Sequence, residues 1–330
     1  MRVDRGTRVR FRRRASWLAA GAVLAGAFGL MTWLAVASHD SSATPASVIT
    51  ASTSTAPTPL VASGAPGLLG PELGARVVTG RVGCQDRRAP VLRVLQFNIR
   101  AARSGGGYVD LPQIAAEIEA VRPDLVSLNE VDSDTSRTRA DEPAYLAGAT
   151  GLHVVFGPNL IYDGGPFGNA ILTRYPVVDS RNLRLPGTPG LEPRGLLTVV
   201  VSVGGQKVTF SSTHLSDGDE GSQSRAVQAL AVARALRSTT APTILAGDLN
   251  SVPADVPARI LRRDLLDAQE EGGTGRGDTY PQADPSSRFD YILYNRRLAP
   301  VPGSTHVRAS RSSDHRSVFT QLTLLPDHGC

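Results

Sequence analysis

The sequence predicts one folded domain of the α/β class over residues 84–330. Short apolar runs bounded by polar residues have the length of buried β-strands, and two longer segments between them have helical periodicity. Some neighbouring runs are joined by connections too short for a helical crossover. We therefore expect mixed sheets, in which antiparallel neighbours accompany parallel ones, with helices interspersed between the strands.

Individual elements follow from local signals. Asp110 can cap a helix that runs to Val121 with a proline in its first turn, and a second helix is predicted over 225–237. Gly204 and Gly205 are expected to form the turn of a hairpin. The expected strands cover residues 91–97, 125–128, 170–173, 196–203, 208–211, 243–246, 291–294 and 317–325.

The first 83 residues have a different composition. Residues 1–14 form a basic flank, and the uncharged run 15–37 is 23 residues long, enough for a transmembrane helix in a bilayer core of roughly 30 Å. We expect a single-pass anchor in the cell membrane, with the remainder extracytoplasmic. Cleavage after Ala37, which would release a secreted protein, and a buried helix are the alternatives. Residues 38–83, rich in Ser, Thr, Ala and Pro, are predicted to be a flexible tether.

The net charge of +5 belongs to the basic flank. The first fourteen residues hold seven arginines and one aspartate, which leaves 28 basic and 29 acidic residues in the remainder. A domain that grips nucleic acid usually has a basic excess, because neutralisation of phosphates supplies much of the affinity. Nucleic acid is therefore a less favoured partner than other phosphate esters. Separately, we expect the protein to be a monomer.

The sequence contains only two cysteines, Cys84 and Cys330, near the two ends of the predicted domain. Outside the membrane, thiols tend to oxidise. The hypothesis is a disulfide that joins the first and last strands; the alternative is two unrelated thiols.

Polar side chains occur at the ends of several predicted strands. Taken singly, each is more often a turn former or a solvated acid, but together they make a set suited to phosphate ester hydrolysis. A divalent cation can offset charge on phosphoryl oxygens, and Mg²⁺ prefers oxygen ligands. Our candidate ligands are Glu130, Asn98 and Asp314, with Mn²⁺ or Ca²⁺ as substitutes for Mg²⁺.

The remaining candidates supply acid–base groups. Asp248 and Asn250 lie two residues apart, so an extended backbone would place both on one side, where they could hold a water molecule. His315 follows Asp314, and Asp290 is the candidate that fixes its tautomer. His214 would supply a second imidazole for the phosphate oxygens.

Seven short motifs occur in an order that resembles the endonuclease/exonuclease/phosphatase superfamily, whose fold is like that of deoxyribonuclease I. The similarity spans about residues 91–325. Each motif is weak alone, but the ordered set is specific. The motifs lie at residues 97–100, 128–131, 168–172, 213–215, 247–250, 289–292 and 313–315.

This resemblance implies a four-layered α/β sandwich, with two mixed sheets face to face and flanked by helices. It also implies that Glu130 holds the metal, that Asp248 and Asn250 position the water, and that Arg194 contacts phosphate. Asn169 is a second candidate for substrate binding. Two positions depart from known branches of the family: Asn169 is an amide near the place where secreted deoxyribonucleases use a carboxylate to support the first histidine. Arg100 stands where apurinic-site repair enzymes carry an acid.

The expected function is that of a membrane-anchored, Mg²⁺-dependent phosphoesterase, acting on phosphodiesters of lipid or envelope type. An extracellular nuclease is the alternative enzyme. A surface-binding module without activity is the alternative from another class.

Overall fold

The structure is a computed structural model that describes residues 89–326. The predicted transmembrane helix at 15–37, the tether at 38–83 and both cysteines lie outside the described residues. No helix between residues 89 and 326 is both long and apolar enough to cross a membrane.

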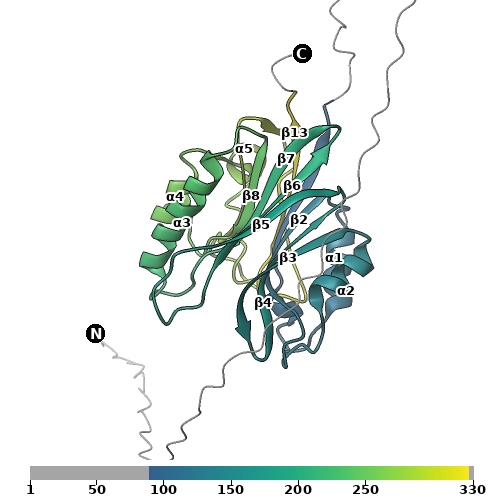
Figure 1. Cartoon of the computed structure of the whole chain (residues 1–330), viewed down its shortest axis with the longest axis vertical. Coiled ribbons are helices and arrows are strands. Elements are labelled where there is room, and N and C mark those ends of the chain that lie inside the picture. Colours follow the sequence, from purple (N-terminus) through teal and green to yellow (C-terminus); the bar gives the residue numbers. More distant parts are fainter. Residues whose placement is uncertain (1–88, 327–330) are drawn as a thin grey trace, which may run out of the picture. The chain divides into compact units, whose positions relative to one another are not determined.

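The first sheet has seven strands, in the order β11-β13-β1-β2-β4-β3, with β12 paired to β13 (Figure 1). The neighbours β1 and β2 are parallel, and the other pairs are antiparallel. The strands are β1 (Val91–Asn98), β2 (Leu125–Asp132), β3 (His153–Tyr162), β4 (Gly165–Thr173), β11 (Leu298–Pro300), β12 (His306–Arg308) and β13 (Ser317–Leu324).

The second sheet has six strands, in the order β5-β6-β7-β8-β10-β9. It too is mixed, because β7 and β8 are parallel whereas the other pairs are antiparallel. The expected hairpin of β6 and β7 is present, and Gly204 and Gly205 adopt φ angles of 58° and 90° in its turn. The strands are β5 (Val177–Arg184), β6 (Gly195–Val203), β7 (Gln206–His214), β8 (Thr243–Asp248), β9 (Leu266–Asp267) and β10 (Asp290–Tyr294).

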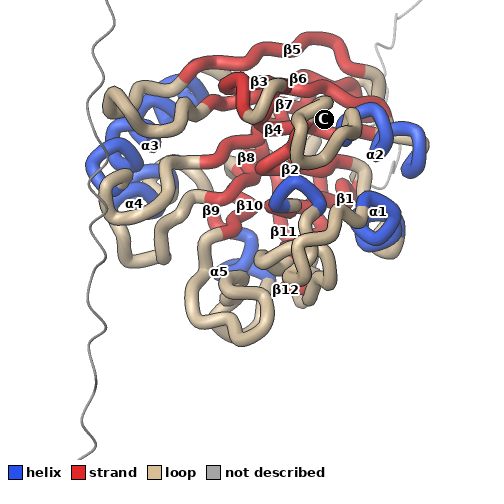
Figure 2. Tube along the Cα trace, turned by 90° about the horizontal axis from the view of Figure 1, so that it is seen from below, coloured by secondary structure: helices blue, strands red, loops and turns tan. Residues whose placement is uncertain are grey.

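Helices cover the outer faces of the two sheets (Figure 2). The predicted cap of α1 is confirmed, since Oδ1 of Asp110 accepts a hydrogen bond from the Gln113 amide at 3.0 Å. Helices α1 and α2 pack with the first sheet, and α3 and α4 pack with the second. The helices are α1 (Leu111–Glu119), α2 (Glu142–Thr150), α3 (Ser222–Arg237), α4 (Val256–Leu261) and α5 (Ala268–Gly272), with a 3₁₀ turn at Arg100–Ala102.

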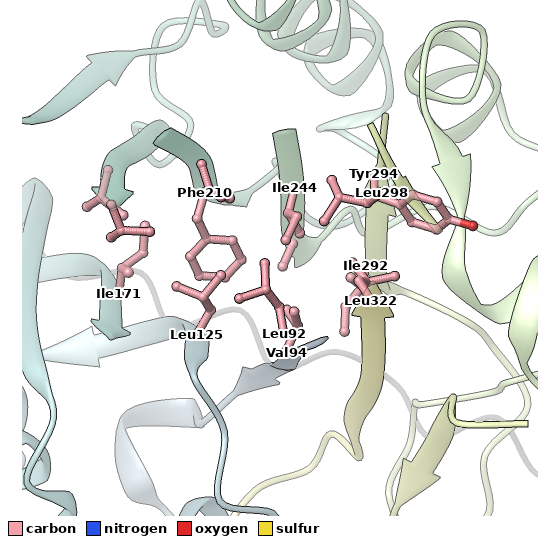
Figure 3. Close-up of a cluster of buried hydrophobic side chains, with 14 of the residues drawn as sticks. Leu92, Val94, Leu125, Ile171, Phe210, Ile244, Ile292, Tyr294, Leu298 and Leu322 are labelled. Carbon is pink, nitrogen blue, oxygen red and sulfur yellow. The ribbon is translucent and has the colours of Figure 1, made fainter. Parts of the chain in front are cut away.

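An apolar core lies between the two sheets (Figure 3). Leu92 and Leu125 of the first sheet meet Phe210, Ile244 and other side chains of the second, and all are buried. Two further clusters lie between each sheet and its helices. The predicted arrangement of two packed mixed sheets flanked by helices is therefore confirmed.

Strand periodicity decides which side chains continue this inner core. Leu92 and Val94 of β1 face the second sheet, whereas Leu95 and Phe97 face the helices. Because side chains alternate with a period of two, Asn98 points between the sheets. The inner face thus turns polar where β1 ends.

Candidate active site

Strand register brings four of the candidate residues into line at one edge of the sandwich. In the first sheet Asn98 is paired with Asn129. In the second, Asp248 is flanked by His214 on β7 and by Asp290 on β10. β7 and β8 end at this edge and β10 begins there, so residues far apart in the sequence share one end of the inner face.

Glu130 reaches the same edge through a β-bulge. The register between β2 and β4 shifts between Leu128 and Val131, and Glu130 adopts a φ of 56°. Simple alternation would place Glu130 on the helix-covered face with Leu128, but the extra residue re-aims its side chain. Its Oε1 accepts a hydrogen bond from Nδ2 of Asn98 at 2.9 Å.

Asp248 and Asn250 line the same cavity, although not through an extended backbone as the sequence spacing indicated. β8 ends at Asp248, and Asn250 adopts a φ of 46° in the turn that follows. Its amide N–H donates to Oδ1 of Asp248 at 2.9 Å, so the aspartate side chain closes the turn. Oδ2 of Asp248 accepts from Nδ2 of Asn98 at 3.0 Å.

His315 lies in the loop before β13 and is held by Asp290. Nδ1 of His315 is 2.9 Å from Oδ2 of Asp290, and both side chains are buried. The loop itself is anchored, because the Ser313 hydroxyl donates to the Asn98 carbonyl at 2.7 Å and accepts from the His315 amide. Nε2 of His315 is 3.7 Å from Oδ2 of Asp248. This is the contact that the predicted orienting role of Asp290 requires.

His214 has a different environment. Its Nδ1 is 2.8 Å from Nη1 of Arg194, and arginine has no acceptor, so Nδ1 accepts this hydrogen bond. The proton of a neutral His214 therefore belongs on Nε2, which is 3.0 Å from Nδ2 of Asn250 and 3.6 Å from Oδ2 of Asp248. Nδ2 of Asn250 is itself a donor, to the Leu215 carbonyl at 3.1 Å, so the acceptor that this proton faces is the carboxylate of Asp248.

Electrostatics separate the two histidines. Burial, reinforced by the charges of Arg194 and His315, holds the pKa of His214 well below its ordinary value. Burial also acts to lower the pKa of His315, but the carboxylates of Asp290 and Asp248 outweigh it and raise that pKa to about 10. Burial raises the pKa of Asp248 as well. Two titratable groups with opposite shifts are typical of distinct roles in one reaction.

Asn169 lies beneath this layer and not beside His214. Its Oδ1 accepts from Nδ2 of Asn129 at 2.9 Å, and its Nδ2 donates to the Gly195 carbonyl at 3.2 Å. Arg194, and not Asn169, makes the side-chain contact with His214 that the family resemblance indicated for the region of Asn169. A substrate contact by Asn169 stays a prediction.

Two buried amides that the sequence analysis did not select support the site. Nε2 of Gln96 donates to Oδ1 of Asn129 at 2.7 Å and to Oδ1 of Asp290 at 3.2 Å. Oδ1 of Asn129 also accepts from the Asp248 amide at 3.1 Å. Strand alternation places both on the inner face, and Asn129 also lies within the motif at residues 128–131.

A cavity of about 510 Å³ opens above these groups. Seven of the ten candidate residues line it, and so do Arg137, Tyr162 and Tyr280. The other three, Asn98, Asp290 and Asn169, do not line the cavity. Arg194 is only 4% exposed, and its Nε has no hydrogen-bond partner among the described residues. A buried donor beside a cavity is suited to binding an anionic oxygen.

Two sets of side chains could hold a cation. Ligand atoms of Asp248, Asp290 and His315 lie within 4.8 Å of one another, but Asp290 is already engaged by His315 and Gln96. Glu130 and Asp314 both line the cavity, and Asp314 is about one-third exposed. We favour Glu130 and Asp314, because a hard cation needs open carboxylates and room for its waters.

Asn98 is placed between these groups. Its Nδ2 bridges Glu130 and Asp248, and its Oδ1 accepts from the Arg100 amide at 3.0 Å. Direct ligation through Oδ1 requires rotation of this amide, whereas ligation through water does not. Nε of Arg100 is 3.3 Å from Oδ2 of Asp314.

The sequence model of the Endonuclease/Exonuclease/phosphatase family matches residues 95–315, which include all ten candidate residues. The chain belongs to this family. Its members are metal-dependent phosphoester hydrolases, so the protein is an enzyme of that class. The cluster of carboxylates and imidazoles has the side-chain types that such hydrolysis uses.

The chain is similar to individual proteins in sequence or in fold. The endonuclease/exonuclease/phosphatase from Beutenbergia cavernae is 30% identical, with a TM-score of 0.62 over 71% of this chain and 72% of its own. The uncharacterized protein YbhP of Escherichia coli K12 is 26% identical over 65% of this chain and 88% of its own length. The human Nocturnin catalytic domain, at 22% identity, shares the fold with a TM-score of 0.58, covering 72% of this chain and 95% of that domain.

Proposed function

We propose that this enzyme is a membrane-anchored, extracytoplasmic, Mg²⁺-dependent phosphodiesterase that acts on esters of lipid or envelope type. The observation that carries the proposal is the convergence of Asp248 with two imidazoles of opposite pKa shift at one cavity. Such a set can orient a water molecule and protonate a leaving group at the same phosphorus.

Glu130 and Asp314 would hold the divalent cation, with Asn98 contributing directly or through water. Once bound, the cation supplies neutralisation of charge on the phosphoryl oxygens. Arg194 and the Nε2 proton of His214 supply further hydrogen-bond donors at the cavity. Mn²⁺ or Ca²⁺ are possible substitutes, because the same oxygen ligands suit them.

The chain's own side chains account for the proton movements. A water oriented by Asp248 and Asn250 attacks phosphorus, and one of its protons passes to Asp248. The bond between phosphorus and the ester oxygen breaks, and the departing oxygen takes the Nε2 proton of His315. The products are an alcohol and a phosphate group that has gained the water oxygen. Asp290 balances the charge of the imidazolium before that proton leaves.

The anchoring part of the proposal rests on the sequence. The uncharged run 15–37 after seven arginines suits a single-pass helix with the arginines in the cytoplasm. A tether over 38–83 would hold the catalytic domain near a membrane surface and raise its local concentration there. Cleavage after Ala37 would instead release the enzyme.

The proposal is tested with bis(p-nitrophenyl) phosphate as substrate, with and without Mg²⁺. Glu130→Ala and His315→Ala are each expected to lower turnover by about 100-fold or more, because each removes a group acting at the reacting atoms. Circular dichroism verifies that the variants are folded. Near-normal activity in both variants would reject the assignment.

A nuclease is the second candidate, and the fold alone permits it. One structural relative is the zebrafish (D. rerio) TDP2 complexed with a single-strand DNA product, at 22% identity. Salt-sensitive DNA binding and plasmid nicking by the purified protein would favour this function over the proposed one.

A further inference from the structure

We propose that Arg137, Tyr162 and Phe167 form a subsite for the alcohol part of the ester, and that this part is an uncharged, hydroxyl-rich ring. The inference rests on the proposed phosphoesterase function and adds the class of substrate. All three residues line the cavity that holds the catalytic groups, and none belongs to the motifs that identify the family.

Arg137 is held in the cavity wall by a buried partner. Its Nε and Nη2 bond the two oxygens of Asp132 at 2.7 and 2.8 Å, and Asp132 is completely buried. The hydroxyl of Thr135 donates to the same carboxylate at 2.6 Å. The guanidinium is therefore fixed in position, while its Nη1 has no hydrogen-bond partner among the described residues. Its two N–H groups can donate to a ligand.

This guanidinium already occupies the place against two rings that a cationic ligand would take. It lies 4.4 Å from the ring centroid of Tyr162 and 5.2 Å from that of Phe167. One positive charge is thus already held against both rings. A quaternary ammonium group would have to displace Arg137, which Asp132 holds in place, to take that position.

The rest of the lining disfavours a polyanion. The cavity is bordered by six carboxylates and only three guanidinium groups. Two of those guanidiniums are paired with acids: Arg137 with Asp132, and Arg194 with Glu192 at 2.9 Å. A nucleic acid strand or a second phosphate would bring further negative charge towards this lining. The acids are Glu130, Glu192, Asp217, Asp219, Asp248 and Asp314.

Neutral hydroxyl groups fit the hydrogen-bonding groups of this part of the cavity. Vicinal hydroxyls can accept from Nη1 of Arg137 and donate to exposed carboxylate oxygens such as Oδ2 of Asp217, a side chain that is 75% exposed and whose Oδ1 is 3.4 Å from Nη2 of Arg194. The ring of Tyr162, in a residue that is 42% exposed, offers an apolar edge against the carbon skeleton. A sugar or cyclic polyol combines these properties.

Two diesters with the same glycerophosphate part test the idea on the full-length protein with Mg²⁺. Glycerophosphoinositol carries a hydroxyl-rich ring, and glycerophosphocholine carries a quaternary ammonium. We expect kcat/KM to be at least about tenfold higher for the inositol ester, with the difference mainly in KM. Bis(p-nitrophenyl) phosphate serves as an activated reference ester for the chemical step.

Arg137→Gln and Tyr162→Leu should each lower the inositol-to-choline ratio of kcat/KM by about fivefold or more. Tyr162→Leu is the safer variant, because Arg137→Gln leaves buried Asp132 without its partner. Arg174→Gln is the matched control: it breaks an Arg–Asp ion pair of 2.7 Å that does not line the cavity, and it should leave the ratio unchanged.

Equal turnover of the two diesters, or preference for the choline ester, with the reference ester still cleaved, would overturn the subsite alone. A ratio that does not change in Tyr162→Leu would do the same. Failure to hydrolyse any of the three esters would overturn the proposed function and the subsite together.

Discussion

Oδ2 of Asp290 lies 2.9 Å from Nδ1 of His315, which fixes the imidazole so that its Nε2 faces Asp248. Asp290 begins β10, and His315 belongs to the loop before β13, so the pair connects the two sheets. Both residues are buried, and the second oxygen of Asp290 is held by Gln96. The contact therefore has the rigidity that a general acid requires.

Replacement of Asp290 by Asn should lower turnover by about 100-fold or more. An amide can keep one hydrogen bond to Nδ1, but it cannot balance the charge of an imidazolium. The measurement is kcat on bis(p-nitrophenyl) phosphate with Mg²⁺. Asp124→Asn, which alters the ion pair with Arg174 away from the cavity, is the control and should keep its activity. Equal losses in the two variants would contradict a specific role for Asp290.

The two histidines should titrate differently in the metal-free protein. Three carboxylates raise the pKa of His315 to about 10, so its imidazolium should persist when the pH is increased well above neutrality. Burial and the charge of Arg194 lower the pKa of His214, so this ring should remain neutral at pH values where an ordinary histidine is protonated. Nitrogen chemical shifts from an NMR titration measure both. Identical titration of the two rings would refute the assignment of roles.

Glu142, at the start of α2, should make stability fall as pH rises. Burial is the main cause that raises its folded-state pKa from 4.5 to about 8. Between these values the folded protein binds more protons than the unfolded chain, so the free energy of unfolding decreases with increasing pH. Each pKa unit corresponds to about 1.4 kcal/mol.

Glu142→Gln should remove that dependence and stabilise the protein near pH 8, because the amide oxygen can still accept from the Asp132 N–H. Urea unfolding at several pH values measures the effect. Glu119→Gln, an exposed position on α1, is the control. A slope in Glu142→Gln equal to that of the wild type would show that Glu142 carries no proton in the folded state.

Mg²⁺ should stabilise the folded protein through Glu130. A ligand present at 100 times its Kd adds about 2.7 kcal/mol to the free energy of unfolding, which appears as a higher Tm. Glu130→Gln should lose most of this Mg²⁺-dependent shift, because the neutral amide is a weaker ligand. Asp264→Asn changes an exposed carboxylate that is paired with Arg237 and should retain the shift. A full shift in Glu130→Gln would place the cation elsewhere, with the set of Asp248, Asp290 and His315 as the next candidate.

The two cysteines should be joined in the mature protein. β1 and β13 are antiparallel neighbours, with Val91 opposite Thr323. Cys84 precedes Val91 by seven residues and Cys330 follows Thr323 by seven in the sequence, and both cysteines lie outside the described residues. Mass spectrometry under non-reducing conditions should find no alkylatable thiol. Two free thiols would reject the disulfide.

Much of the fold was accessible to sequence reasoning because burial leaves a periodic trace. The buried strands β1, β8, β10 and β13 were predicted to within a few residues, as was the hairpin of β6 and β7. The strand β5 was missed, since most of its residues are exposed and polar. Helix α2 was missed as well, because it has little apolar periodicity to reveal it.

The candidate site was accessible for a different reason. Short motifs in family order named the residues, and strand alternation accounts for why Asn98, His214, Asp248 and Asp290 share the inner face. The sequence did not reveal where side chains depart from the simple alternation of a strand. The bulge at Glu130 and the left-handed turn at Asn250 depend on tertiary packing that overrides local preference.

The strand-rich α/β core, the family and the set of carboxylates and imidazoles could all be recognised in the amino-acid sequence. The folded structure was needed to see that Arg194, and not Asn169, contacts His214, and that Arg137 lies against two aromatic rings beside the catalytic groups. Hydrophobic periodicity is a property of the local sequence, whereas the pairing of polar side chains depends on distances between strands and loops that meet only in the folded molecule.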